Sequence, residues 1–156
     1  MPVRSTCGLS RAKKIGIVFR LTSGERDQKI IKLGKDLATQ NIIADLLAYT
    51  PSLKSKKGNP PLDVAIFTDK DLNWLWFPKS KKLNDFINND FDILISLCTT
   101  KCMPVESIVA LSKAGFRVGA YSNHSLALYD FMVQNNFKGK EELLMQEIIH
   151  YLKIIK

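Results

Sequence analysis

Residues 91–122 are the part of the sequence that most constrains the fold. They read FDILISLCTTKCMPVESIVALSKAGFRVGAYS. Asp92–Cys98 is a short apolar run with β-branched residues, which is typical of a strand buried on both faces, and residues 116–121 form a second such run. Between them, Pro104 marks the first turn of a helix that ends before Gly115. Two strands joined by one helix form a right-handed βαβ unit, and a parallel sheet built this way needs helices on its faces.

The rest of the chain repeats this pattern with one interruption. Apolar runs predict further strands over residues 14–21, 42–49 and 64–68, although the second of these could also continue a helix. Amphipathic patterns predict helices over residues 24–40 and 140–155 and a helix that begins at Ser122. Residues 50–62 contain three prolines and predict a loop where a crossover helix is expected. An irregular or antiparallel edge strand is therefore one expectation.

These elements predict the fold class and the domain organisation. At 156 residues the chain has the size of one domain. We expect a single three-layer α/β domain over residues 14–156, Rossmann-like or flavodoxin-like, with about five mostly parallel strands. Residues 1–13 show no periodicity and predict a basic N-terminal arm, which is either a solvated tail or an anchor to a partner.

The net charge of +8 is concentrated in two segments. Residues 1–14 carry four basic residues and no acidic one, and residues 53–82 carry seven lysines and three aspartates. Such an excess favours RNA or another polyanionic partner. No apolar run is long enough to cross a membrane, no secretory signal is visible, and the three cysteines do not form a disulfide framework. These features predict a cytoplasmic protein.

Aromatic residues interleaved with lysines make residues 69–82 the most unusual stretch. Tryptophan rings can stack on bases while lysines contact phosphates, as in single-stranded nucleic-acid binding. The same residues can instead cover the edge of the sheet or bind another protein subunit. The candidate residues for a nucleic-acid or partner surface are Arg4, Arg11, Lys54, Lys56, Lys57, Trp74, Trp76, Lys79, Lys81 and Lys82.

A second candidate site lies where the predicted strands end. Ligands of open α/β sheets bind at the carboxyl edge, and a phosphorylated molecule could bind there. The candidates are Ser23, Arg26, Thr99, Thr100, Cys102, Ser122 and His124. However, neither a G-x-G-x-x-G nor a G-x-x-x-x-G-K-[ST] motif is present, and a capping box formed by Thr22 and Glu25 explains the first turn without a ligand.

The sequence contains no specific catalytic, cofactor or metal signature. Cys98 and Cys102 have neither the redox nor the zinc spacing, although the following helix N-terminus should lower the pKa of Cys102. His124 could lie near Cys102, since both follow predicted strands. We therefore predict no catalytic residue, no cofactor and no metal.

Several segments together resemble a known family. The segments KKIGIVF, FTDKDLNWLWFPK, FINNDFDILISL, SKAGFRVGAYS and YDFMV are similar to those of small uncharacterised Rossmann-like proteins known chiefly from Bacteroidetes. The resemblance covers residues 13–156 and implies a single Rossmann-like domain in the cytoplasm, without an established activity.

Three functions are compatible with these observations. The leading hypothesis is a non-enzymatic protein that binds RNA, for example in the ribosome, or another acidic partner. The first alternative is a small-molecule enzyme or sensor with a phosphorylated ligand at the carboxyl edge. The second is a subunit that docks on another protein through Trp74–Phe77. The sequence leaves the oligomeric state open.

Overall fold

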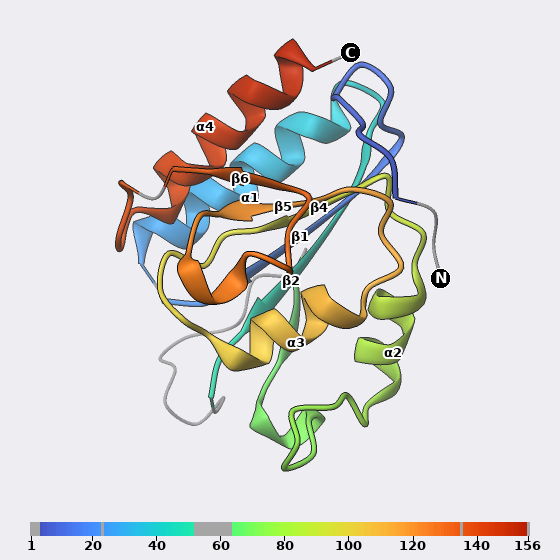
Figure 1. Cartoon of the computed structure of the whole chain (residues 1–156), viewed down its shortest axis with the longest axis vertical. Coiled ribbons are helices and arrows are strands. Elements are labelled where there is room, and N and C mark those ends of the chain that lie inside the picture. Colours follow the sequence, from blue (N-terminus) through green and yellow to red (C-terminus); the bar gives the residue numbers. More distant parts are fainter. Residues whose placement is uncertain (1–3, 23, 52–63, 135, 156) are drawn as a thin grey trace.

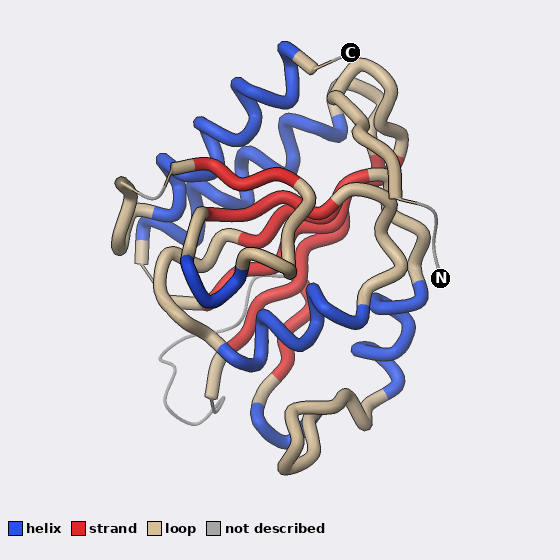
Figure 2. The backbone as a smooth tube through the Cα atoms, in the orientation of Figure 1, coloured by secondary structure: helices blue, strands red, loops and turns tan. Residues whose placement is uncertain are grey.

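Six short apolar segments form one sheet in which every neighbouring pair of strands is parallel. The computed structural model describes residues 4–22, 24–51, 64–134 and 136–155. The strand order is β3-β2-β1-β4-β5-β6, which is the Rossmann order (Figures 1 and 2). The strands are β1 (Lys14–Arg20), β2 (Ile43–Tyr49), β3 (Val64–Phe67), β4 (Ile93–Ser96), β5 (Arg117–Ala120) and β6 (Phe131–Val133).

Helices cover both faces of this sheet and complete three layers. Figure 1 shows α1 (Glu25–Ala38) and α4 (Glu141–Ile154) on one face, with α2 (Lys81–Asn88) and α3 (Met103–Leu111) on the other. The central strand β1 contributes to both hydrophobic cores, because Ile17 packs toward α1 and α4 while Val18 packs toward α2 and α3. The predicted α/β class and its layered arrangement are confirmed. None of the described helices is long and apolar enough to cross a membrane.

The predicted βαβ unit is confirmed, with slightly narrower bounds. It consists of β4, α3 and β5, and Ile95 is paired with Val118 in parallel register. All four residues of β4 are buried, as expected for a strand covered on both faces. The second strand is confirmed over Ile43–Tyr49, and residues 42–49 do not continue α1.

Two predictions about the sheet are wrong. The helix predicted after Ser122 is a short 3₁₀ helix, η3 (Asn123–Ser125), followed by the sixth strand β6. Asp130 fixes the start of β6, since its backbone N–H donates to the carbonyl of Arg117 and its carboxylate accepts from the N–H of Arg117 at 2.9 Å. The irregular or antiparallel edge is also absent from the described strands, because β3 pairs with β2 in parallel.

The N-terminal segment packs on the domain from residue 4 onward. Cys7, Leu9 and Ala12 are buried in the core between the sheet and α1 and α4. The backbone N–H of Leu9 donates to the carbonyl of Leu152 near the end of α4, at 2.9 Å. Residues 4–13 contain no helix or strand, but they do not form a solvated tail.

Substitution of Gly8 by alanine tests this packing. A Cβ atom at Gly8 would lie 1.9 Å from the carbonyl oxygen of Ile155, so backbone must move. We expect the free energy of unfolding to fall by about 1–3 kcal/mol, measured by urea denaturation. Arg11→Ala is the control, because an exposed side chain of the same segment should change stability by less than about 0.5 kcal/mol. Equal stability of Gly8→Ala and the wild type would contradict the packing of this segment.

Candidate functional site

The sheet changes its direction of winding between β1 and β4. The chain leaves β1 toward α1 on one face and leaves β4 toward α3 on the other. In open α/β sheets, the carboxyl ends of the two strands at such a point form the usual ligand crevice. The residues that follow β1 and β4 therefore decide whether a ligand can enter there.

Four side chains of the protein itself interact at this point, and we call them the switch-point network: Arg26, Asp27, Thr99 and Glu141. Arg26 forms ion pairs with Glu141 and, at 3.4 Å, with Asp27. Asp27 also accepts hydrogen bonds from the N–H and the hydroxyl of Thr22 at 2.9 and 2.8 Å. Thr99 donates to Glu141 at 3.0 Å. Asp27, Thr99 and Glu141 are buried, so the network ties the starts of α1 and α4 to the end of β4.

This network changes two predictions about the first turn. The capping box of Thr22 and Glu25 is wrong, because Thr22 pairs with Asp27 and the N-cap of α1 is Gly24, without a side-chain hydrogen bond. Arg26 is a candidate contact for a phosphorylated ligand in the sequence. In the structure its guanidinium group instead pairs with Glu141 and donates to the carbonyl of Arg20. Ser23 lies outside the described residues.

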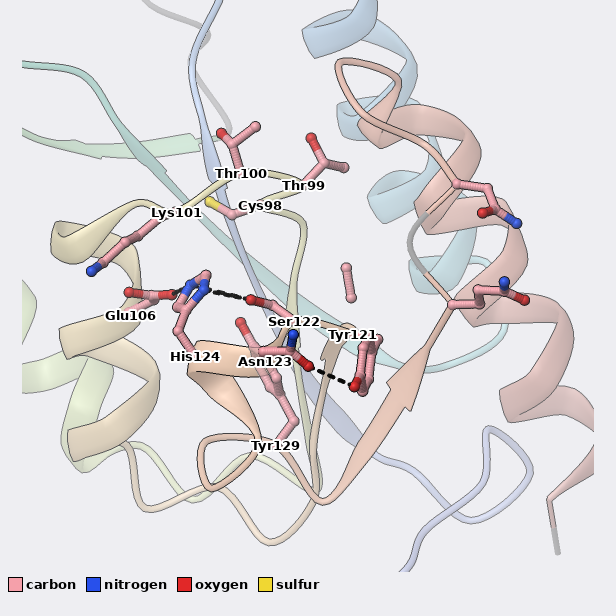
Figure 3. Close-up of a pocket in the computed structure, with 13 residues that line it drawn as sticks. Cys98, Thr99, Thr100, Lys101, Glu106, Tyr121, Ser122, Asn123, His124 and Tyr129 are labelled. Atoms are coloured by element: carbon pink, nitrogen blue, oxygen red, sulfur yellow. Dashed lines mark hydrogen bonds and ion pairs between the residues drawn. The ribbon is translucent and has the colours of Figure 1, made fainter.

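A pocket of about 450 Å³ opens beside the network, at the carboxyl ends of β4, β5 and β6. We call it the carboxyl-edge pocket (Figure 3). Four residues predicted from the sequence line it together: Thr99, Thr100, Ser122 and His124. Sequence reasoning missed further polar lining residues: Lys101, Glu106, Tyr121, Asn123, Tyr129, Gln134 and Asn136. Lys101 and Asn123 could have been predicted, because each is adjacent in sequence to a residue already predicted to lie at a strand end.

His124 is held from both sides within the pocket. Its Nε2 atom lies 2.9 Å from a carboxylate oxygen of Glu106, and its Nδ1 atom lies 2.5 Å from the hydroxyl of Ser122. Figure 3 shows the imidazole ring between these two groups. Glu106 comes from the first turn of α3, whereas Ser122 and His124 follow β5. The arrangement joins two elements and fixes the orientation of the ring.

The two cysteines after β4 interact with each other. Cys98 lines the carboxyl-edge pocket, while Cys102 is buried as the N-cap residue of α3. The hydrogen bond from Cys98 is the main cause that lowers the pKa of Cys102 to about 7, and the backbone N–H of Val105 adds to it. The predicted direction is confirmed, with Cys98 as the larger cause. The contacts of His124 are with Ser122 and Glu106, which leaves its predicted proximity to Cys102 unsupported.

The aromatic stretch forms a separate surface, which we call the aromatic loop (residues 72–78). Figure 1 shows it at the lower end of the molecule, beyond α2 and α3. Trp74 is 85% exposed and Trp76 is 37% exposed. The loop is well fixed, because the side-chain oxygen of Asn73 accepts from the N–H groups of Leu75 and Phe77 at 2.8 and 3.0 Å. The prediction that the two tryptophan rings cover the edge of the sheet is therefore wrong, whereas Leu72 at the start of the loop is buried in the core.

The basic residues predicted beside this loop are partly engaged within the protein. Lys81 pairs with Asp85 at 2.8 Å, and Lys82 donates to the carbonyl of Ile66 at 2.6 Å. Arg4 pairs with Asp130 at 2.7 Å, far from the loop in the sequence. Arg11 and Lys79 are exposed. Lys54, Lys56 and Lys57 lie outside the described residues.

Comparison with known proteins gives one result. The profile of a family described as "Family of unknown function (DUF6913)" matches residues 2–155. No curated protein matches the chain significantly. No solved structure matches it significantly either.

The switch-point network predicts a specific loss of stability. Glu141→Gln removes one of the two charges that pair with Arg26 while it keeps an acceptor for Thr99, so the largely buried Arg26 retains only the longer contact with Asp27 at 3.4 Å. We expect the free energy of unfolding to fall by about 1–3 kcal/mol, measured by urea denaturation. Glu142→Gln is the matched control, since it removes the same charge from the same turn of α4 without breaking this pair. Equal effects of the two substitutions would contradict the role of the network.

Proposed function

The chain belongs to the family of unknown function DUF6913, and from its own geometry we propose that it binds a small phosphorylated molecule in the carboxyl-edge pocket. The observation that carries this proposal is the position of the pocket. Hydrogen-bonding side chains from the ends of two adjacent parallel strands converge on a cavity of about 450 Å³. This volume is within the range of small-molecule sites, and the edge is the one that such folds use for ligands.

The lining of the pocket supplies groups that suit a phosphate. Lys101 provides a positive charge, and Thr100 and Asn123 provide hydroxyl and amide donors. Lys101 also lies two residues before the first residue of α3, where the helix dipole favours an anion. The carboxylate of Glu106 faces His124, so part of its negative charge is directed to the imidazole.

The closed switch point supports this location over the usual crevice. The Arg26–Glu141 pair and the buried carboxylate of Asp27 occupy the ends of β1 and β4 on the side of α1 and α4. A phosphate placed there would meet two carboxylates that already share one guanidinium group. The pocket along β4 and β5 offers Lys101 instead, and Glu106 is the one carboxylate among the described residues that line it.

A thermal-shift screen of nucleotides and sugar phosphates tests this proposal. A ligand at 100 times its Kd stabilises the protein by about 2.7 kcal/mol. We expect Lys101→Ala to weaken binding at least tenfold, because the phosphate loses its charge-assisted hydrogen bond. Lys113→Ala is the control, since this exposed lysine lies outside the pocket. A flat screen, or equal binding by Lys101→Ala, would reject the proposal.

The aromatic loop supports a second candidate function, which is binding of single-stranded RNA. The observation that favours it is the high exposure of Trp74 on a loop whose backbone is fixed by Asn73. A rigid exposed ring loses little entropy when a base stacks on it. The ion pair of Lys81 and the hydrogen bond of Lys82 leave fewer cations for phosphates, which places this candidate second. We rank three further proposals with this second candidate. They are a protein partner on the same rings, RNA in the ribosome, and a cytoplasmic location.

Binding of a fluorescent single-stranded RNA at several salt concentrations tests this second candidate. We expect Trp74→Ala to weaken binding by about 1–3 kcal/mol with an unchanged salt slope, because base stacking is removed. Joint replacement of Lys79, Lys81 and Lys82 by alanine should reduce the salt slope by about 0.7 for each phosphate that is no longer neutralised. Tyr151→Ala, at an exposed ring on α4, is the control. No retention of RNA at low salt would exclude RNA as the partner of the aromatic loop.

A further inference from the structure

The contacts of His124 define its hydrogen-bonding state. Because an ionised carboxylate can only accept, the Nε2 atom that faces Glu106 at 2.9 Å carries a proton and donates it. In the neutral ring, Nδ1 is then an acceptor, and the hydroxyl of Ser122 donates to it at 2.5 Å. The ring is therefore placed to take a proton from Ser122 while Glu106 stabilises the resulting imidazolium.

The usual structural role of such a serine does not account for this contact. Ser122 is the N-cap residue of η3, yet its side chain makes no capping hydrogen bond. Its hydroxyl is directed toward His124, which in turn contacts a residue 18 positions earlier in the sequence. A hydroxyl nucleophile, an imidazole base and an orienting carboxylate in hydrogen-bond contact are the signature of nucleophilic catalysis, whatever the fold.

We propose that Ser122 is a nucleophile, that His124 is its general base, and that Glu106 is a positioning residue for His124. The substrate class is a small carboxylic ester that carries an anionic group. The carboxyl-edge pocket holds this site, and Lys101 in its lining is the partner for the anionic group. This inference rests on the proposed function, because it assigns a reaction to a ligand of the same pocket.

The reaction has two balanced steps. In the first, the oxygen of Ser122 forms a bond to the ester carbonyl carbon while its proton moves to Nδ1 of His124. The tetrahedral intermediate then expels the alkoxide, which takes that proton and leaves as the alcohol. In the second step, water attacks the acyl group on Ser122, His124 takes its proton and returns it to the oxygen of Ser122, and the carboxylic acid leaves.

Covalent labelling of the full chain tests the nucleophile directly. The wild type is incubated with a fluorophosphonate and, separately, with the smaller phenylmethanesulfonyl fluoride, and adducts are located by peptide mass spectrometry. We expect one adduct, on Ser122, with each probe that reacts. Ser107→Ala is the control, because this hydroxyl of α3 bonds to the carbonyl of Pro104 and lies outside the carboxyl-edge pocket.

Variants of the other two residues separate a chemical role from a structural one. We expect His124→Ala to slow labelling on the order of 10²-fold, the usual effect of a general base, and added imidazole to restore part of the rate. Glu106→Gln should slow labelling less, and Glu106→Asp should recover part of that loss. No adduct with either probe, an adduct on another residue, or labelling of His124→Ala at the wild-type rate would overturn the inference.

The labelling result and the thermal-shift screen distinguish this inference from the proposed function. A wild type that is stabilised by phosphorylated molecules but is not labelled would retain the binding function and lose the reaction. Labelling of Ser122 without stabilisation by any phosphorylated molecule would support the nucleophile and reject the phosphorylated ligand. Failure of both measurements would reject both proposals.

Discussion

The parallel pairing of β1 with β4 is the constraint on which the rest of the structure depends. Ile15 pairs with Ile93 and Val18 pairs with Ser96, so both strands end at the same edge of the sheet. Since each crossover is right-handed, the helices after β1 and β4 lie on opposite faces. The pairing therefore produces the three layers and places the two cores on either side of β1. Because the other neighbouring pairs are also parallel, every loop that follows a strand lies at one edge.

The protein fills the usual ligand crevice with its own charges and leaves a pocket beside it. A buried ion pair costs desolvation, and it is tolerated when further hydrogen bonds satisfy its members. Glu141 meets this condition through Arg26 and Thr99. Thr99 also lines the carboxyl-edge pocket, so the network supports one wall of that pocket. A structural ion pair and a candidate ligand site thus share a residue at the end of β4.

The sequence was sufficient where one local pattern determined the outcome. The apolar run of β4 and the turn at Pro104 predicted the βαβ unit, and strand ends predicted that Thr99, Thr100, Ser122 and His124 would share an edge. The sequence was insufficient where a contact joins residues that are far apart along the chain. Glu141 is 115 residues from Arg26, and Glu106 looks like a solvated helix residue until His124 is placed beside it. The strand β6 was missed because three residues are too short to show a period of two.

We propose that the carboxyl-edge pocket along β4 and β5 is the ligand site of this protein. The most direct measurement is a titration of the ¹⁵N-labelled protein with inorganic phosphate, followed by backbone amide chemical shifts. We expect saturable shifts confined to Thr100–Cys102 and Ser122–His124. Saturable shifts at the start of α1 or in the aromatic loop, with none in the pocket, would contradict this claim.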